Sequence, residues 1–176
     1  MKKRPARPKV VVAKEFRLVD KSGNTRAILE LDDKGDPHLG LFDRKDKLRA
    51  SLALHDGQSF LELLDKNEKV RATIGLGKSG RPSLALFSNK EQDGAVLQMG
   101  KDGGPGLDLY DKKGELRASF SLYSEDGFPK LALIDRDGKR CRVPGLTEVG
   151  TPFLALFDKA GDLYTAVGLG DDEYGA

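Results

Sequence analysis

The sequence predicts an all-β protein of seven tandem two-stranded units, each about 23 residues long. Three observations support this fold class. A motif written D-x-x-G-x-x-R-A returns at a nearly constant interval, and alternating aliphatic segments flank each copy. No window shows the 3.6-residue period of an amphipathic helix. Glycine is abundant, at 21 of 176 residues, and tryptophan is absent, as suits a chain with many tight turns.

The motif predicts a turn of fixed geometry. D-x-x-G is typical of a type I turn in which Asp accepts backbone N–H bonds and Gly takes the left-handed conformation that closes a hairpin. Wherever the motif has its Arg, that Arg follows the Asp by six residues. The copies are spaced by 22 to 24 residues, and their first positions are Asp20, Asp43, Asp65, Ser88, Asp111, Asp135 and Asp158.

Short strands are predicted on both sides of each motif. Segments such as "PHLGLFD" and "SFLELLD" precede it, and segments such as "RAILEL" and "RASLAL" follow it. Both alternate with period two, which indicates strands with two unlike faces and gives fourteen strands in all. The turns that join one unit to the next ("DDKGD", "HDGQ", "SEDGF") vary in length, so we expect functional additions there.

Pairing two strands across the fixed turn predicts that one face of the hairpin is aliphatic. Setting Phe42 opposite Arg49 places Leu41 opposite Ala50 and Leu39 opposite Leu52. These aliphatic residues then share a face, which we expect to be buried. The other face would place an apolar or aromatic residue opposite each Arg; the predicted pairs are Val19–Arg26, Phe42–Arg49, Leu64–Arg71 and Tyr110–Arg117.

A single hairpin cannot bury its apolar face, so the units must stack or meet another chain. Three arrangements are compatible with the pattern. The antiparallel meander can close as a layered sheet, a ring or a barrel. Alternatively, each unit forms one coil of a two-sided β-solenoid. In the third arrangement, chains complete one another's faces in an oligomeric fibre or ring.

Charge divides the chain into three regions. Residues 1–14 hold six of the 30 basic residues and no acid, and they are predicted to form a disordered arm that can touch an anionic surface such as phosphate or lipid. The repeat domain is assigned to residues 15–170, and residues 171–176 form an acidic tail. No segment is long and apolar enough for a secretory signal or a membrane span, which predicts a cytoplasmic protein.

The residues that usually carry chemistry are sparse. His38, His55 and the single Cys141 have no metal-ligand spacing, so we predict solvated histidines and no metal. "DRDGK" at Asp135 resembles the start of a calcium loop, but its twelfth position is Leu146 rather than an acid. No phosphate loop or nucleophile motif is present, so we predict no catalytic residue, no cofactor and no enzyme.

The sixth copy departs from the motif. Pro144 interrupts its second strand and indicates an edge strand or a bulge. Basic neighbours flank Cys141 and would lower the pKa of an exposed thiol, which is a hypothesis of a reactive cysteine.

The repeated Arg and aromatic positions are the candidate ligand-binding residues. Each Arg either covers its apolar neighbour across the strand pair or contributes to a periodic row that binds a glycan or polyanion, with aromatic rings as stacking platforms. The candidates are Arg26, Arg49, Arg71, Arg117, Phe42, Phe87, Tyr110 and Phe157.

The predicted function is that of a non-catalytic β-repeat scaffold or protein-interaction module that is able to assemble with itself. Its partner would be another copy or another protein. The alternative is a lectin-like or polyanion-binding receptor that uses the Arg and aromatic rows.

Overall fold

A computed structural model describes residues 10–88, 93–122, 129–146, 152–158, 160 and 162–168, without the side chains of 93 and 140–146. The described residues form strands and turns. They contain no helix, and therefore no helix that could cross a membrane. The strands are β1 (Phe16–Val19), β2 (Thr25–Leu31), β3 (Pro37–Phe42), β4 (Leu48–His55), β5 (Gln58–Leu64), β6 (Val70–Leu76), β7 (Pro82–Phe87), β8 (Asp93–Met99), β9 (Pro105–Tyr110), β10 (Leu116–Ser121), β11 (Lys130–Ile134), β12 (Arg140–Leu146), β13 (Pro152–Phe157) and β14 (Leu163–Gly168).

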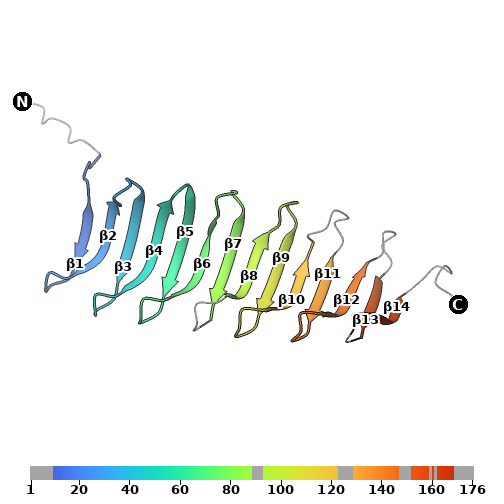
Figure 1. The fold of residues 1–176 in the computed structure, drawn as a ribbon. Coiled ribbons are helices and arrows are strands. Elements are labelled where there is room, and N and C mark those ends of the chain that lie inside the picture. Colours follow the sequence, from blue (N-terminus) through green and yellow to red (C-terminus); the bar gives the residue numbers. More distant parts are fainter. Residues whose placement is uncertain are drawn as a thin grey trace, which may run out of the picture.

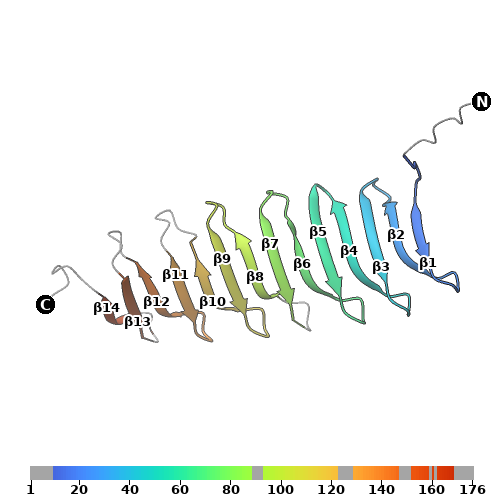
Figure 2. The ribbon, with the colours of Figure 1, turned by 180° about the vertical axis from the view of Figure 1, so that it is seen from behind.

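All fourteen strands lie in one sheet, in the order of the sequence. Each strand pairs antiparallel with the strand before it and the strand after it, so the chain is a simple meander. Figures 1 and 2 show a single layer, with the two ends of the chain at opposite ends of the sheet. The predicted hairpin repeats are therefore confirmed.

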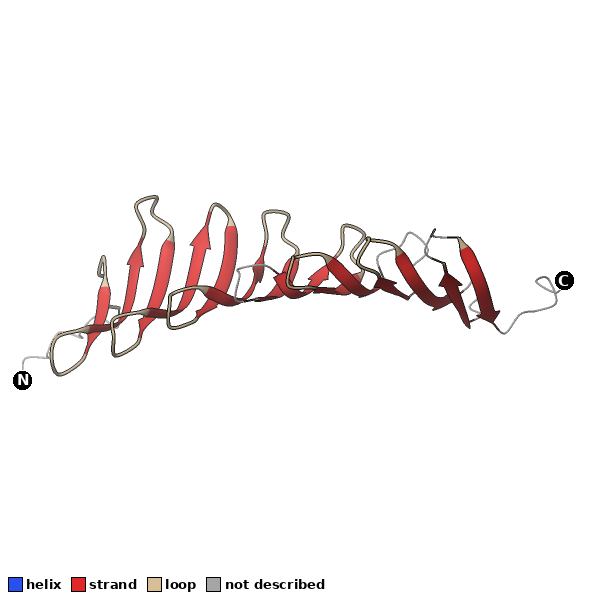
Figure 3. Cartoon of the chain, turned by 60° about the horizontal axis from the view of Figure 1, so that its bottom comes forward, coloured by secondary structure: helices blue, strands red, loops and turns tan. Residues whose placement is uncertain are grey.

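The predicted closure of the meander is wrong, and so is the solenoid alternative. The sheet is open: β1 and β14 are its two edges and do not meet. Every inner strand completes its backbone hydrogen bonds with its neighbours in sequence, so no long-range pairing is needed to satisfy the backbone. Seen from below in Figure 3, the open sheet twists along its length, as antiparallel sheets do.

The fixed turns have the predicted geometry. In the first copy Asp20 N donates to Asn24 O at 2.9 Å, and Gly23 N donates to Asp20 O at 3.0 Å. The fourth turn residue is left-handed, as expected for Gly23, with φ of 85°. In the second and third copies this position holds Asp46 (φ 57°) and Glu68 (φ 60°), which adopt the same conformation without being glycine.

The turns at the opposite edge are less variable than expected. Residues 32–36, 77–81 and 100–104 make the same pair of backbone hydrogen bonds as the fixed turns. The turn between β4 and β5 is tighter, with positive φ at both Asp56 and Gly57. One turn type thus connects most strands at both edges of the described sheet.

The predicted register is confirmed on the aliphatic side and wrong at the arginines. Leu41 pairs with Ala50 and Leu39 with Leu52, as expected. Phe42, however, pairs with Leu48, and Arg49 is the extra residue of a bulge. The left-handed turn residue adds one residue to the second strand, which displaces the pairing by one. The same one-residue shift recurs in the hairpins whose first strand ends at Val19, Leu64 or Tyr110.

The face predicted to be buried is the exposed one. Leu52 and Ile74, on the aliphatic face, are each 53% exposed. The buried residues lie on the opposite face instead, mostly along the middle of the strands; they are Ile28, Gly40, Ser51, Ala85, Gly106, Asp108 and Ala155. Larger side chains cover these small ones: a Cβ built on Gly40 would lie 3.1 Å from His38 Cε1 and 3.3 Å from Leu48 Cδ1.

The turn from Gly77 to Arg81 allows a direct test of the left-handed position. Gly80 has φ of 74° and open space around a built Cβ, whereas Gly77 has the same open space without positive φ. We expect Gly80→Ala to lower the free energy of unfolding by about 1–2 kcal/mol, because a Cβ is strained in this conformation. Gly77→Ala should leave stability unchanged or slightly raised. Urea unfolding of both variants checks this, and equal losses at the two positions would contradict it.

Candidate interaction surfaces

One face of the sheet carries an unbroken row of large apolar residues. Because directly paired residues share a face, the strand pairings place one such residue from every strand from β1 to β11 in line across the sheet. The row is Phe16, Leu29, Leu39, Leu52, Leu61, Ile74, Leu84, Leu97, Leu107, Phe120 and Leu131. Leu154 and Val167 pair in the same way on β13 and β14.

Beside it, nearer the fixed turns, lies a second row in which leucine and alanine alternate strictly. Its members are Leu18, Ala27, Leu41, Ala50, Leu63, Ala72, Leu86, Ala95, Leu109, Ala118 and Leu133. We call the surface formed by these two rows, together with the leucines, Met99 and prolines that follow them toward the other edge, the apolar face. Large and small residues therefore alternate from strand to strand in the second row, whereas the first row holds large residues only.

The apolar face is both exposed and uncharged. Over β1 to β11, no charged residue occupies a position on this face. Its exposed large hydrophobic residues number nineteen: Phe16, Leu18, Leu29, Leu31, Leu41, Leu52, Leu54, Leu61, Leu63, Ile74, Leu76, Leu84, Leu86, Leu97, Leu107, Leu109, Phe120, Leu154 and Val167. Soluble proteins rarely expose a contiguous apolar surface of this kind, and where they do, it commonly marks a site of interaction.

The candidate arginines lie on the opposite face, at the edge with the fixed turns, and three of them bind their own turn. Each donates its Nε to the aspartate that begins that turn. The pairs are Arg26 with Asp20 at 2.9 Å, Arg71 with Asp65 at 2.8 Å and Arg117 with Asp111 at 2.8 Å. We call these three residues the turn-bridging arginines.

The turn-bridging arginines also reach the next unit of the repeat. Arg26 Nη1 donates to the Asp43 carbonyl oxygen at 2.6 Å, and Arg71 and Arg117 donate in the same way to Ser88 and Asp135. One guanidinium thus joins a side chain of its own turn to the backbone of the following turn. Their exposed side-chain fractions are only 18–24%, so these groups are largely enclosed by the protein.

The aspartates of these turns have two roles. Asp20 Oδ1 accepts hydrogen bonds from the backbone of Ser22 and Asn24, while Oδ2 accepts from Arg26. The hydrogen bond from Arg26 lowers the pKa of Asp20 to about 2, and that from Arg71 lowers the pKa of Asp65 to about 2. Sequence reasoning missed this pairing, although the constant six-residue spacing of Asp and Arg was its signal.

Arg49 differs from the turn-bridging arginines. Its Nε lies 3.8 Å from Asp43 Oδ2, and its Nη1 is enclosed without a hydrogen-bond partner in the described part of the chain. Residues of the neighbouring turns make other contacts here: Glu68 binds Lys47 Nζ at 2.6 Å and accepts the Leu48 N–H at 3.2 Å.

The candidate aromatic residues line the same edge as the arginines. Phe42, Phe87, Tyr110 and Phe157 end their strands just before the turn, on the face opposite the apolar face, and all four are half-buried. Structure therefore brings the predicted Arg and aromatic positions to one edge of one face. Whether they bind a glycan or a polyanion stays a prediction.

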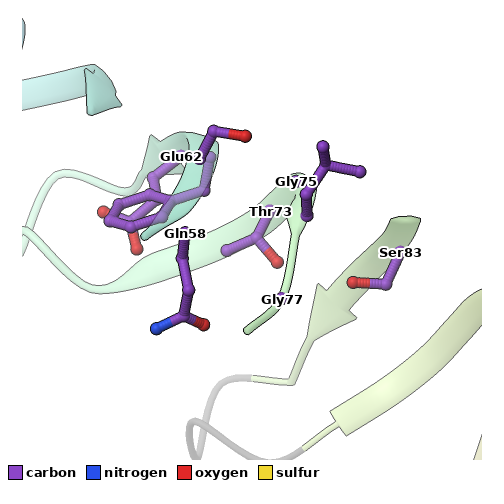
Figure 4. A pocket seen from close by; sticks show the side chains of 9 residues that line it. Gln58, Glu62, Thr73, Gly75, Gly77 and Ser83 are labelled. Atoms are coloured by element: carbon purple, nitrogen blue, oxygen red, sulfur yellow. The ribbon is translucent and has the colours of Figure 1, made fainter. Parts of the chain in front are cut away.

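A shallow hollow of about 220 Å³ lies on this same face, over β5 to β7. Figure 4 shows Glu62, Thr73, Gly75 and Ser83 among the residues that line it. Gly75 and Ser83 pair with each other in its lining, and a Cβ built on Gly75 would clash with Ser59 O, so the backbone of β5 passes close to this glycine. Its one carboxylate, from Glu62, and three hydroxyl residues, Ser59, Thr73 and Ser83, give it no nucleophile paired with a base.

Asp32, Asp36 and His55 form a small cluster at the edge opposite the fixed turns. Their possible ligand atoms lie within 4.8 Å of one another. His55 Nδ1 is 3.7 Å from Asp32 Oδ2, and His55 Nε2 is 3.5 Å from Asp56 Oδ2. Asp32 Oδ1 accepts the backbone N–H of Lys34, so that oxygen already holds its turn. These contacts tie neighbouring turns together.

Several predicted features lie wholly or partly outside the described residues. Residues 1–9 of the basic arm and the tail at 171–176 are outside, while residues 10–14 are exposed and belong to no strand. Only the backbone is described for Cys141 and Pro144, in β12, so the hypothesis of a reactive thiol stays untested.

Neither a family model nor a curated protein matches this sequence. Among solved structures, the chain is similar to the E1021V mutant of the TCP10 domain of Danio rerio CPAP. The identity is 14% and the TM-score 0.34, with 86% of this chain and 98% of that chain covered. A similarity at this level has no bearing on the function.

The turn-bridging arginines predict a structural effect that Arg49 should lack. Arg71→Ala removes the hydrogen bonds to Asp65 and Ser88, so we expect it to lower the Tm by several degrees. Arg49→Ala removes one long ion pair and an unsatisfied Nη1, so its effect should be clearly smaller. Thermal unfolding followed by circular dichroism compares the two, and an equal or larger loss for Arg49→Ala would refute the assignment.

The lowered pKa values predict a loss of stability in acid. The pKa of Asp20 and Asp65 is about 2 in the folded chain and about 3.9 in an unfolded one. The unfolded state therefore takes up protons first, so the stabilisation is complete above about pH 4 and disappears as the pH falls toward 2. Tm measured from pH 7 to pH 2 should fall less steeply in Asp20→Asn/Asp65→Asn than in the wild type. Identical slopes would contradict the pairing.

Proposed function

We propose that this protein is a non-catalytic β-repeat scaffold whose apolar face is its docking surface for protein. The observation that carries the proposal is the set of nineteen exposed large hydrophobic residues on one face, which has no charged residue from β1 to β11. The opposite face covers its own small residues, so it needs no partner to do so. The two faces therefore differ in how much apolar surface they leave exposed to water.

The size of the apolar face supports the proposal. Burying an aliphatic side chain contributes ~2.5 kcal/mol at ~25 cal/mol per Å², or ~100 Å² of apolar surface for each. Nineteen side chains about half exposed thus present on the order of 900 Å². That exceeds the ~300–600 Å² of the largest apolar patch on a typical monomer.

The total surface leads to the same conclusion. A compact monomer of 19.2 kDa has an accessible surface of ~8,400 Å² by the usual scaling with mass. This chain exposes 13763 Å². An open single layer cannot by itself bury as much surface as a compact domain of the same mass. A partner that covers one face would bury part of the difference.

The hydrogen bonds of the arginines favour this proposal over a polyanion receptor. Arg26, Arg71 and Arg117 already bind a carboxylate and a backbone carbonyl within the fold. A phosphate or sulfate group would have to displace those partners. The absence of a catalytic role is likewise our proposal, and it rests on the open, weakly functionalised hollow of the opposite face.

Two substitutions on the apolar face test the proposal. Leu61→Lys/Leu84→Lys places charges in the central row, where a docked protein would have to desolvate them. We expect a tagged full-length wild-type chain, expressed in the cells that naturally make it, to retain a stoichiometric protein partner that this double variant loses. The retained protein is analysed for two species. One is a second copy of this chain that carries a different tag, and the other is any other protein chain.

Ser83→Lys is the control for the charge at Leu84, because it adds a single positive charge at the neighbouring residue but into the hollow of the opposite face. It should retain the partner as the wild type does. Loss of the partner in both variants, or in neither, would contradict docking through the apolar face.

A further inference from the structure

We infer that the occupant of the apolar face is a second copy of this chain, packed face to face to form a two-layer sandwich. This inference rests on the proposed function, since it names the partner that the docking surface takes. The contact would be isologous, with the same rows of residues contributed by both copies.

The extent of the face favours a copy over an unrelated protein. A stable protein–protein interface buries ~800 Å² on each partner, and the apolar face offers on the order of 900 Å². A partner must present an apolar and uncharged surface of the same elongated shape, or its own polar groups would be buried unpaired. A second copy meets these requirements by construction.

The alternation of leucine and alanine in the second row gives the apolar face raised and recessed positions that are complementary to those of a facing copy. Adjacent strands are ~4.8 Å apart, so the leucines of the second row stand ~10 Å apart with an alanine between each pair. A facing copy has the same spacing, which lets the leucines of one sheet enter the alanine positions of the other. Packed sheets of this kind lie ~10 Å apart.

The charged residues of β1 to β11 also fit this arrangement. Aspartates, lysines and the turn-bridging arginines lie at the two edges or on the opposite face, where they stay in water when the apolar faces meet. Face-to-face packing covers both apolar faces at once, so association ends at two copies. Joining β1 of one copy to β14 of another would leave the apolar face bare in every copy.

Light scattering on a sizing column, combined with small-angle X-ray scattering, tests the inference on the full wild-type chain. We expect a mass twice the 19.2 kDa of one chain, held over a hundredfold range of concentration. The scattering cross-section should have the thickness of two sheets, with the length of one chain. Leu84→Lys should shift the mass toward that of one chain, while Ser83→Lys should keep the doubled mass.

Three results would overturn the inference: a wild-type mass of one chain at every concentration, a particle lengthened with single-sheet thickness, or a Leu84→Lys variant that keeps the wild-type mass. If Leu84→Lys loses its strand signal in circular dichroism, the wild-type scattering decides alone. A monomeric wild type that still retains another protein through the apolar face would refute the second copy and leave the proposed function standing.

Discussion

A single layer of β-sheet satisfies the backbone of its inner strands but leaves two faces open to water, and this constraint governs the whole molecule. Local hairpins complete the hydrogen bonds without any long-range contact. The opposite face then protects itself, because small residues such as Ser51 and Ala85 lie beneath larger neighbours and are only 5% and 8% exposed. The apolar face has no such cover, so it forfeits about 1 kcal/mol for each half-exposed leucine.

The repeat units are joined along one edge by more than backbone pairing. A turn-bridging arginine connects the aspartate of its own turn to the carbonyl of the next turn, so adjacent turns are held at a fixed separation. Asp46 and Glu68 extend this edge network, since each uses its left-handed turn position to reach a basic residue of the preceding unit. Ion pairs between units therefore accompany Asp46 and Glu68, the two positions in the described fixed turns that lack glycine.

The local features of the fold could be predicted from the sequence, because they depend on neighbouring residues. Period-two alternation gave the strands, and the spacing around Gly23 and Gly114 gave the turns. The bulge at Arg49 could not be foreseen from alternation, since it depends on how the left-handed residue displaces the second strand.

Closure and burial could not be predicted because they depend on the whole sheet. An aliphatic row such as Leu39 and Leu52 looks like a core in sequence, yet none of the described residues folds over it. The roles of Arg71 and Arg117 were obscured for a related reason: their carbonyl partners lie 17 and 18 residues away and become neighbours only through the meander.

We propose that the apolar face is covered in the working protein, and hydroxyl-radical labelling of its side chains tests this most directly. Leu52, Ile74 and Phe120 are each more than half exposed in the single chain. We expect these residues to be labelled slowly in the wild-type chain and faster in Leu84→Lys, whereas Tyr164, on the other face, should be labelled at the same rate in both. Labelling of all three at the rate of a free peptide in the wild-type chain would contradict the proposal.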